Sequence, residues 1–332
     1  MRAVRMLGRE RVEVIDRPEP EPAGDRVVVR VMASALCGSE RHAYAGPEPR
    51  AGNGGHEAAG VVVAADAARH CRVGDRVLVF AASPCGRCRH CLAGRWILCR
   101  ARVPAPTGGM HAQLALVRDD LCFAIPGDLS FEQAALLSDV LGTPFRALRR
   151  LGASALDTVL ITGQGPVGLA ATMLCRFLGA RVLAADINDY RLERAAAAGA
   201  TRVVNPLRED IRSAALELTD GEGADLALEC SATADGAAAC VAAVRTAGRV
   251  AFIGLTGPVT LDITAQLILR DLQLIGSWYS DPADLAELAS IVRRGLDLSP
   301  LVTHRYGIEE AGEAFATFFG GRSAKVILEP SR

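Results

Sequence analysis

Residues 158–168 read Thr158-Val159-Leu160-Ile161-Thr162-Gly163-Gln164-Gly165-Pro166-Val167-Gly168. The apolar run predicts a buried strand over 158–162, and the pattern that follows predicts a helix over 167–178. Between them lies G-x-G-x-x-G: its first glycine permits a tight turn, its second lets the backbone approach a pyrophosphate, and its third lets helix and strand pack. The helix start also offers free N–H groups to phosphate oxygens. The segment therefore predicts a dinucleotide-binding loop made of Gly163, Gly165, Pro166, Val167 and Gly168.

A second predicted strand, 181–185, ends at the acidic residue Asp186. A carboxylate at this place accepts hydrogen bonds from the adenosine ribose and would repel a 2′-phosphate. NAD is therefore the expected cofactor rather than NADP. Arg191 is close enough in sequence to meet the adenosine or its ribose, so NADP stays open as the less favoured choice.

Strands and helices alternate through the rest of this region. Further strands are predicted at 201–204, 225–229, 249–253 and 272–276. Continuous apolar strands separated by helices indicate a parallel sheet covered on both faces, which is a doubly wound Rossmann arrangement. Gly254, after one of these strands, is a further cofactor-binding candidate. The segment 249–254, with 259–261, is a candidate edge strand for pairing between subunits.

The preceding part of the chain has a different pattern. Residues 1–141 contain short apolar runs at 27–31, 60–63 and 76–80, broken by many Gly and Pro residues. This pattern predicts an all-β, barrel-like domain. The last strand-like run, 325–328, is expected to return to it. The predicted domains are 1–141, completed by 297–332, and 142–296.

Four cysteines lie close together in the first domain with the spacing C-x2-C-x2-C-x7-C: Cys85, Cys88, Cys91 and Cys99. Four thiolates so placed can enclose one tetrahedral zinc with no open position, which is a structural site. An iron–sulfur cluster is the chemical rival, and the polar surroundings of the loop suit zinc at least as well. A second group, Cys37 and His56, offers two good zinc ligands, but two ligands do not make a site.

Together these segments resemble the zinc-containing medium-chain dehydrogenases/reductases, the class of alcohol, sorbitol and threonine dehydrogenases. The resemblance runs nearly end to end and includes, in order, Cys37-Gly38-Ser39, Gly55-His56-Glu57, Val73-Gly74-Asp75-Arg76-Val77, the four cysteines, Gly108-Gly109-Met110-His111-Ala112 and the glycine loop. It implies a GroES-like catalytic domain and a Rossmann domain, with a catalytic zinc in the cleft between them.

The resemblance also implies roles for individual residues. Cys37 and His56 match two catalytic zinc ligands, and Asp139 matches the third. Glu57 matches an acid close to the metal that either coordinates it transiently or supports the ligands. Thr143 matches a residue near the nicotinamide.

In the chemistry that follows from this resemblance, zinc acts as a Lewis acid on the substrate oxygen and lowers the pKa of the bound alcohol. Ser39 is placed to accept the alcohol proton and His42 to pass it to solvent by way of the cofactor ribose. The alternative for His42 is an ordinary surface histidine. Hydride passes to the nicotinamide, which is cofactor chemistry that the protein orients.

The segment 44–54, between the two ligand-bearing stretches, is shorter than in related polyol dehydrogenases. In relatives it borders the substrate pocket, so a shorter segment predicts a more open entrance. Glu48, Arg50 and Asn53 are candidates to face a polar substrate, with plain solvation as the alternative.

Composition narrows the class of protein further. The chain has 332 residues and a formal net charge of −1, which gives no reason to expect nucleic acid or an anionic membrane as partner. No apolar stretch reaches the length of a transmembrane helix and no signal peptide is recognisable, so a cytoplasmic location is expected. Clustered cysteines in a reducing compartment are more often metal ligands than disulfides.

The sequence thus predicts a dehydrogenase with two zinc ions per chain and NAD that oxidises a secondary alcohol (a polyol, sugar-derived alcohol or cyclitol) reversibly to a ketone. A primary alcohol or aldehyde enzyme on the same scaffold is the first alternative. A zinc-stabilised NAD(H)-binding protein without turnover is the second. A homodimer or homotetramer is expected.

Overall fold

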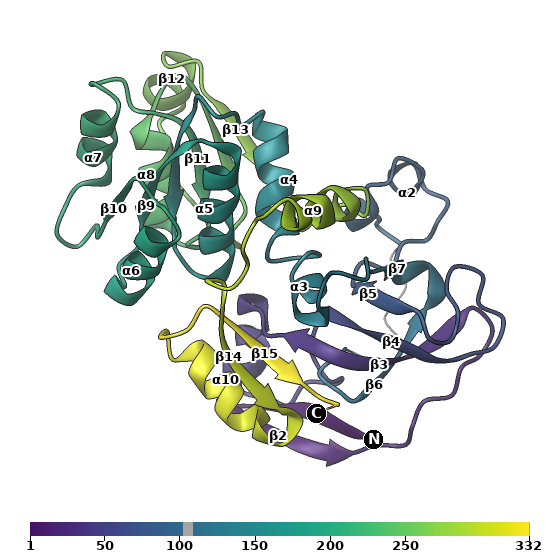
Figure 1. The fold of residues 1–332 in the computed structure, drawn as a ribbon. Coiled ribbons are helices and arrows are strands. Elements are labelled where there is room, and N and C mark those ends of the chain that lie inside the picture. The colour runs from purple at the N-terminus through teal and green to yellow at the C-terminus, as the bar shows by residue number, and fades with distance from the viewer. Residues whose placement is uncertain (102–108, 332) are drawn as a thin grey trace. The chain divides into compact units, whose positions relative to one another are not determined.

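The computed structural model describes residues 1–101 and 109–331, so Gly108 of the motif quoted above lies outside the described residues. The chain divides into two compact units: unit 1 comprises 1–139 and 281–332, and unit 2 comprises 140–280. In Figure 1, where colour follows residue number, the yellow C-terminal strand and helix lie beside the purple N-terminal strands of unit 1. No helix among the described residues is long and apolar enough to cross a membrane.

Unit 1 is built on a mainly antiparallel sheet with the strand order β14-β15-β3-β4-β5-β7, and β6 pairs with β3. A separate hairpin joins β1 and β2. The strands are β1 (Arg2–Gly8), β2 (Arg11–Asp16), β3 (Arg26–Ala35), β4 (Glu57–Ala65), β5 (Arg76–Phe80), β6 (Leu114–Arg118), β7 (Cys122–Ala124), β14 (Val302–Gly307) and β15 (Lys325–Glu329).

The core of unit 1 follows from the alternation of side chains along these strands. Val27, Val29 and Val31 of β3 point to one buried cluster together with apolar residues of β4, β5 and β6. A second cluster joins β1 and β15 to α10 through Val4, Phe315 and other apolar side chains. The last strand therefore belongs to unit 1 because it completes this core.

Short helices connect the strands of unit 1. They are the 3-10 helix η1 (Gly38–Glu40), α1 (Arg41–Ala45), α2 (Arg89–Leu92), η2 (Trp96–Leu98), η3 (Asp119–Leu121), α3 (Phe131–Ala135), α9 (Asp284–Arg293), η5 (Ile308–Glu310) and α10 (Ala311–Phe319). The expected second domain ended at 296, but α9 groups with unit 1. The sequence does not predict this grouping, because an amphipathic helix does not reveal which neighbour covers its apolar face.

Unit 2 has a parallel sheet with the order β10-β9-β8-β11-β12-β13. Its strands are β8 (Thr158–Thr162), β9 (Arg181–Ala185), β10 (Arg202–Val204), β11 (Ala224–Glu229), β12 (Val244–Phe252) and β13 (Gln273–Gly276). The chain runs outward from β8 to β10, then returns and runs outward again from β11. That reversal between β8 and β11 is the switch point at which doubly wound sheets bind ligands. The predicted Rossmann arrangement is confirmed.

The helices of unit 2 explain why its strands read as continuous apolar runs. All residues of β8 are buried, which requires cover on both faces because alternate side chains point opposite ways. The helices are α4 (Gly142–Leu151), α5 (Pro166–Leu178), α6 (Asp189–Ala197), α7 (Ile211–Leu218), α8 (Ala234–Ala243) and the π-helical turn η4 (Ile263–Ile268).

The segment 249–254 was a candidate edge strand, and this prediction is wrong. Residues 249–252 belong to β12, which pairs with β11 on one side and β13 on the other. The edge on this side of the sheet is β13, whose residues 273–276 pair in register with 249–252. The sequence could not show this because strand order depends on pairing and not on apolar content.

Candidate functional site

Four side chains from distant parts of the sequence meet in unit 1: Cys37, His56, Glu57 and Asp139, whose ligand atoms all lie within 4.8 Å of one another. Cys37 follows β3 and begins the turn into η1, whereas His56 and Glu57 stand at the start of β4. Asp139 follows α3. Antiparallel pairing of β3 with β4 brings the first two segments together.

The distances within this cluster suit a common metal ion. His56 Nε2 lies 3.0 Å from Asp139 Oδ2, and Cys37 Sγ lies 3.5 Å from the same oxygen. Thiolate, imidazole and carboxylate are the donors that zinc prefers, and three protein ligands leave a fourth position open for substrate. The arrangement fits a catalytic zinc, with Asp139 as the further donor that Cys37 and His56 alone lacked.

The charges of these buried side chains influence one another strongly. Burial and the Asp139 carboxylate raise the pKa of the Cys37 thiol. Burial would lower the pKa of His56, but Cys37 and Asp139 raise it well above its ordinary value. A divalent cation would supply the charge that the buried anions lack and would favour the deprotonated ligands.

Glu57 is buried beside the ligands and forms an ion pair with Lys325 of β15. Burial raises the pKa of Glu57 to about 7, although the Lys325 ammonium acts in the opposite direction. The second carboxylate oxygen, Oε2, has no hydrogen-bond partner among the described residues. One oxygen is therefore held while the other stays available within the cluster.

Sequence reasoning missed Lys325. It is the only lysine of the chain, its side chain is 1% exposed, and its Nζ also donates to the Leu36 carbonyl at 2.8 Å. A lone lysine in an arginine-rich chain was a usable signal. The ammonium group of lysine is compact, so it fits a small buried site better than the broad, planar guanidinium group of arginine.

Ser39 and His42 lie just beyond the ligand Cys37. The Ser39 hydroxyl donates to Cys37 Sγ at 3.4 Å, and its side chain is exposed to solvent. His42 lies in α1 with an exposed side chain. The structure thus brings Ser39 to the cluster, and the proton relay through His42 stays a prediction.

A buried polar pair that the sequence did not single out lies behind the ligands. Glu40 of η1 and His111 are both buried, with His111 Nε2 at 3.1 Å and 3.2 Å from the two carboxylate oxygens. Burial raises the pKa of Glu40, but His111 and the Cys37 backbone N–H lower it to about 2. The Glu40 side chain is therefore a carboxylate held in place by hydrogen bonds, and it is not suited to donate a proton.

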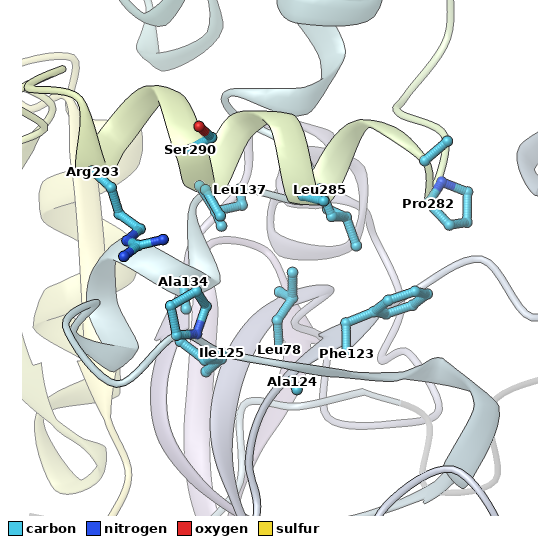
Figure 2. A pocket seen from close by; sticks show the side chains of 14 residues that line it. Leu78, Phe123, Ala124, Ile125, Ala134, Leu137, Pro282, Leu285, Ser290 and Arg293 are labelled. Atoms are coloured by element: carbon cyan, nitrogen blue, oxygen red, sulfur yellow. The ribbon is translucent and has the colours of Figure 1, made fainter.

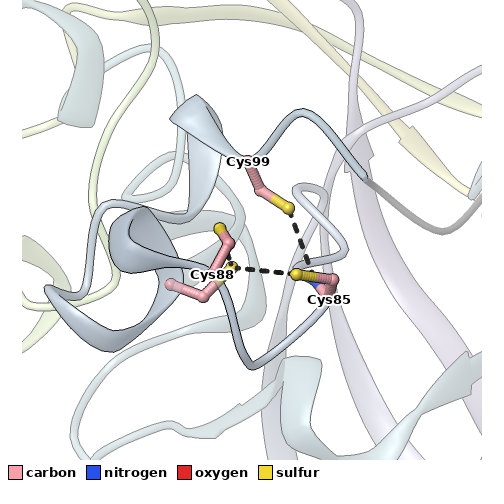
Figure 3. Close-up of side chains that lie close together, drawn as sticks. Cys85, Cys88 and Cys99 are labelled. Carbon is pink, nitrogen blue, oxygen red and sulfur yellow. Dashed lines mark hydrogen bonds between the residues drawn. The ribbon is translucent and has the colours of Figure 1, made fainter.

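The four cysteines 85–99 form a second cluster in unit 1, again with all ligand atoms within 4.8 Å. Figure 3 shows Cys85, Cys88 and Cys99 close together: Cys85 lies in a loop, Cys88 directly precedes α2 and Cys99 directly follows η2. Cys88 Sγ and Cys91 Sγ are 3.4 Å apart, and the Cys85 N–H donates to Cys99 Sγ at 3.5 Å. Backbone N–H groups of Arg87 and Cys88 lower the pKa of Cys85 to about 6. The geometry fits a closed structural zinc site.

The glycine loop of unit 2 has the geometry expected of a phosphate cradle. Gly163 has φ +80°, and a Cβ there would lie 2.5 Å from Ser231. A Cβ at Gly168 would collide with the Gly163 carbonyl, whereas at Gly165 nothing lies within 4 Å. The open space at Gly165 fits a bound pyrophosphate. Pro166 is the first residue of α5, and Pro166 and Val167 are partly exposed.

Asp186 lies at the carboxyl end of β9 and is tied to this loop. Its carboxylate accepts from the N–H of Gln164 at 2.6 Å and of Asn188 at 2.9 Å. Arg191 Nη1 lies 3.6 Å from Asp186 Oδ2. The pair therefore places a carboxylate, partly balanced by a guanidinium, beside the glycine loop.

The surroundings of Gly254 and Thr143, the other two cofactor-binding candidates, point less directly to a cofactor. Gly254 packs against Glu229, and a Cβ there would lie 2.5 Å from Glu229 Oε2. Thr143 is buried in the first turn of α4. Their contact with a cofactor stays a prediction.

In the short segment 44–54, Asn53 has a different environment from the one predicted. Asn53 is buried, accepts from Arg17 Nη1 at 2.5 Å and donates to the Gly109 carbonyl at 3.4 Å. It is therefore a structural residue, neither solvated nor free to meet a substrate. Glu48 and Arg50 are exposed.

A pocket of about 460 Å³ lies elsewhere in unit 1, between α9 and strands β5 and β7. Figure 2 shows Leu285 of α9 on one side of it, facing Leu78 and Phe123 on the other. Its lining is mostly apolar and includes none of the metal-cluster residues. It is therefore separate from the chemistry described above.

Comparison with known proteins agrees with this geometry. Residues 23–127 match the alcohol dehydrogenase GroES-like domain, and 166–294 match the zinc-binding dehydrogenase family. An L-threonine 3-dehydrogenase of Shewanella putrefaciens is 33% identical over 99% of both chains.

Solved structures agree as well. The alcohol dehydrogenase TADH from Thermus sp. ATN1 superposes with a TM-score of 0.91 at 29% identity, with 99% of each chain covered. Galactitol-1-phosphate dehydrogenase from Escherichia coli gives 0.90 at 25% identity, covering 99% of this chain and 100% of that one. The chain therefore belongs to the zinc-dependent medium-chain dehydrogenase/reductase family, and it is an oxidoreductase with a GroES-like domain and a Rossmann-like domain.

Proposed function

We propose that this chain oxidises a secondary alcohol, of the polyol, sugar-derived or cyclitol class, reversibly to a ketone with NAD and two zinc ions per chain. The observation that carries the proposal is the convergence of Cys37, His56 and Asp139, with Glu57 beside them, in unit 1. The names of the relatives, which act on L-threonine and on galactitol 1-phosphate, support a polar hydroxyl-bearing substrate.

Each residue of the cluster then has a task. Cys37, His56 and Asp139 would hold the catalytic zinc. A zinc ion bound there supplies Lewis acidity toward the substrate oxygen. Ser39, whose hydroxyl lies beside Cys37, accepts the alcohol proton, and the exposed His42 passes it to solvent. Lys325 keeps Glu57 in place through Oε1, and Oε2 of that carboxylate has no hydrogen-bond partner among the described residues.

In unit 2 the residues bind and orient the cofactor. The N-terminus of α5 and the open space at Gly165 would receive the pyrophosphate. Asp186 would accept the ribose hydroxyls and disfavour a 2′-phosphate, so NAD is preferred. Arg191 already faces Asp186 at 3.6 Å, which leaves it less available to bind a 2′-phosphate.

We also propose that the chain forms a homodimer or homotetramer through the edge of the unit 2 sheet. The strand β13 pairs on one side only among the described residues, and apolar side chains near it are exposed, among them Ile268 and Leu269. An edge strand with uncovered apolar neighbours is suited to pairing with a second copy.

The first experiment is elemental analysis of zinc per chain, together with NAD and NADP titrations followed by cofactor fluorescence. Two zinc ions and tighter NAD binding are expected. NADH formation is then screened over polyols, cyclitols, L-threonine and matched primary and secondary alcohols. Faster oxidation of primary than secondary isomers would favour the primary-alcohol alternative.

The variant Cys37→Ser separates an enzyme from a binding protein without turnover. It should abolish turnover and leave NAD binding in unit 2 largely intact. Cys240→Ser is the matched control, because Cys240 is buried and contacts the Thr162 hydroxyl in unit 2. Full activity in Cys37→Ser would overturn the proposed metal centre.

A further inference from the structure

The two segments that carry Cys37 and His56 are joined by a carboxylate that is not itself a ligand. Glu40 Oε2 accepts from the Cys37 N–H at 3.0 Å, and Oε1 accepts from the Gly55 N–H at 2.7 Å. One of these N–H groups belongs to a ligand and the other to the residue before a ligand. Glu40 therefore bridges the backbone at both ligand positions.

His111 holds this carboxylate from the opposite side. Its Nε2 lies within 3.2 Å of both Glu40 oxygens, and its Nδ1 lies 2.8 Å from Ser34 Oγ of β3. The ring is fully buried and stands edge-on to Phe315 of α10 at 5.7 Å. Packing and hydrogen bonds thus leave the imidazole a single orientation.

The backbone around Gly54 and Gly55 is fitted closely to these side chains. Both glycines have positive φ, and a Cβ at Gly55 would lie 2.7 Å from the backbone nitrogen of His111. The His111 N–H donates to the Gly54 carbonyl at 3.1 Å, and the Met110 N–H donates to the Gly55 carbonyl at 3.2 Å. The residue before His56 is therefore fixed by both backbone and side chain.

We propose that Glu40 and His111 are positioning residues for the catalytic metal centre, which set the separation of Cys37 and His56. The inference rests on the proposed function, because it requires that the cluster binds zinc. Neither residue belongs to the cluster of candidate ligands formed by Cys37, His56, Glu57 and Asp139. Groups that orient ligands from behind change metal affinity when they are removed.

The chemistry of the pair makes a conservative variant informative. Three donors (the Cys37 N–H, the Gly55 N–H and His111 Nε2–H) share the two oxygens of Glu40. In Glu40→Gln an amide nitrogen replaces one oxygen, so a buried donor would face another donor and lose its acceptor. The ligand segments should then move apart.

The test measures bound zinc per chain in zinc buffers of graded free concentration, for the full chain and its variants. Cys37→Ser identifies which part of the binding curve belongs to the catalytic centre. Glu40→Gln and His111→Leu should weaken zinc binding there by roughly 10–100-fold. His111→Gln, which can still donate to Glu40, should retain most of the affinity. The four-cysteine zinc should remain bound in all of them.

Asp119→Asn is the matched control. Asp119 is a buried carboxylate of the same unit that accepts from the backbone N–H of Arg69 at 2.5 Å and of His70 at 3.0 Å. Its variant converts the same kind of buried, backbone-bonded carboxylate to an amide, as Glu40→Gln does, but leaves the hydrogen bonds of the ligand segments unchanged. It should lower thermal stability and leave zinc affinity at the catalytic centre as in the wild type.

Other outcomes overturn the inference. Unchanged zinc affinity in Glu40→Gln and His111→Leu, in a wild type that binds two zinc ions, would leave the proposed function standing and show the pair to be purely structural. Equal loss in Asp119→Asn, or loss of the four-cysteine zinc as well, would show general destabilisation. A wild type with only one zinc would overturn the proposed centre and the inference with it.

Discussion

The three glycines of the loop 163–168 have different surroundings, so they should respond differently to substitution. Gly163 has a positive φ and lies so close to Ser231 that a side chain would collide with it. A side chain at Gly168 would collide with the Gly163 carbonyl. Gly165 has no neighbour within 4 Å in the direction of a side chain. Two of these positions serve the fold, and the third leaves room for a ligand.

We therefore predict that Gly165→Val abolishes NAD binding while the thermal midpoint of the unliganded chain stays within a few degrees of the wild type. Gly168→Val should instead destabilise unit 2, because the added carbons collide with backbone. Cofactor fluorescence and circular dichroism measure the two effects. Normal NAD affinity in a folded Gly165→Val would contradict the phosphate-binding role of the loop.

The buried ion pair between Glu57 and Lys325 makes a second prediction at the level of residues. Lys325→Met leaves the Glu57 carboxylate buried without its cation, which should lower the free energy of unfolding by about 3–5 kcal/mol. The double variant Glu57→Gln/Lys325→Met should recover much of this loss, because neither charge remains. Urea denaturation of the metal-free chains gives the comparison. A single variant as stable as the wild type would show that the pair contributes nothing net.

At the level of elements, the four-cysteine segment has little regular structure of its own. Its helices α2 and η2 span only Arg89–Leu92 and Trp96–Leu98. Helices of this length are not stable in water by themselves. A metal ion held by the four thiolates is the natural source of their order.

Cys88→Ser should therefore remove one zinc per chain and make the segment 85–99 sensitive to limited proteolysis. NAD binding by unit 2 should persist. Zinc analysis and mass spectrometry of the fragments measure both effects, with Cys240→Ser as the control that keeps its metal. Resistance to protease after loss of the zinc would indicate that the segment holds its shape without metal.

For the whole molecule, the exposed edge of the unit 2 sheet bears on assembly. Ile268 and Leu269 are 66% and 74% exposed and lie at the end of η4, a few residues before the edge strand β13. Apolar side chains beside an unpaired edge would be covered if a second copy added its own β13.

The double variant Ile268→Glu/Leu269→Glu should consequently shift the wild-type dimer or tetramer toward smaller species, because charges would be buried without partners. Light scattering after size exclusion measures the mass. Leu156→Glu is the control, since Leu156 is 92% exposed in the same unit but precedes β8, an interior strand. A monomeric wild type, or an assembly unaffected by the double variant, would contradict this interface.

Two features could be predicted from the sequence because they depend on residues near one another in the chain. The glycine loop needs only a strand, a turn and a helix start, and its glycines show this requirement directly. The four cysteines lie within fifteen positions, 85–99, so their spacing alone indicated a closed site. The parallel sheet was predictable because strands buried on both faces read as unbroken apolar runs.

Other features depend on long-range packing. Asp139 joins Cys37 and His56 only because β3 pairs with β4 and α3 follows the same sheet, and it was predicted by resemblance and not by spacing. Lys325 meets Glu57 because β15 pairs with β3, and His111 reaches Glu40 because the segment before β6 lies against Gly54. Local sequence determined which residues can bind a phosphate or a structural zinc. Tertiary structure decided which buried charges meet, because their energies depend on neighbours that lie far away along the chain.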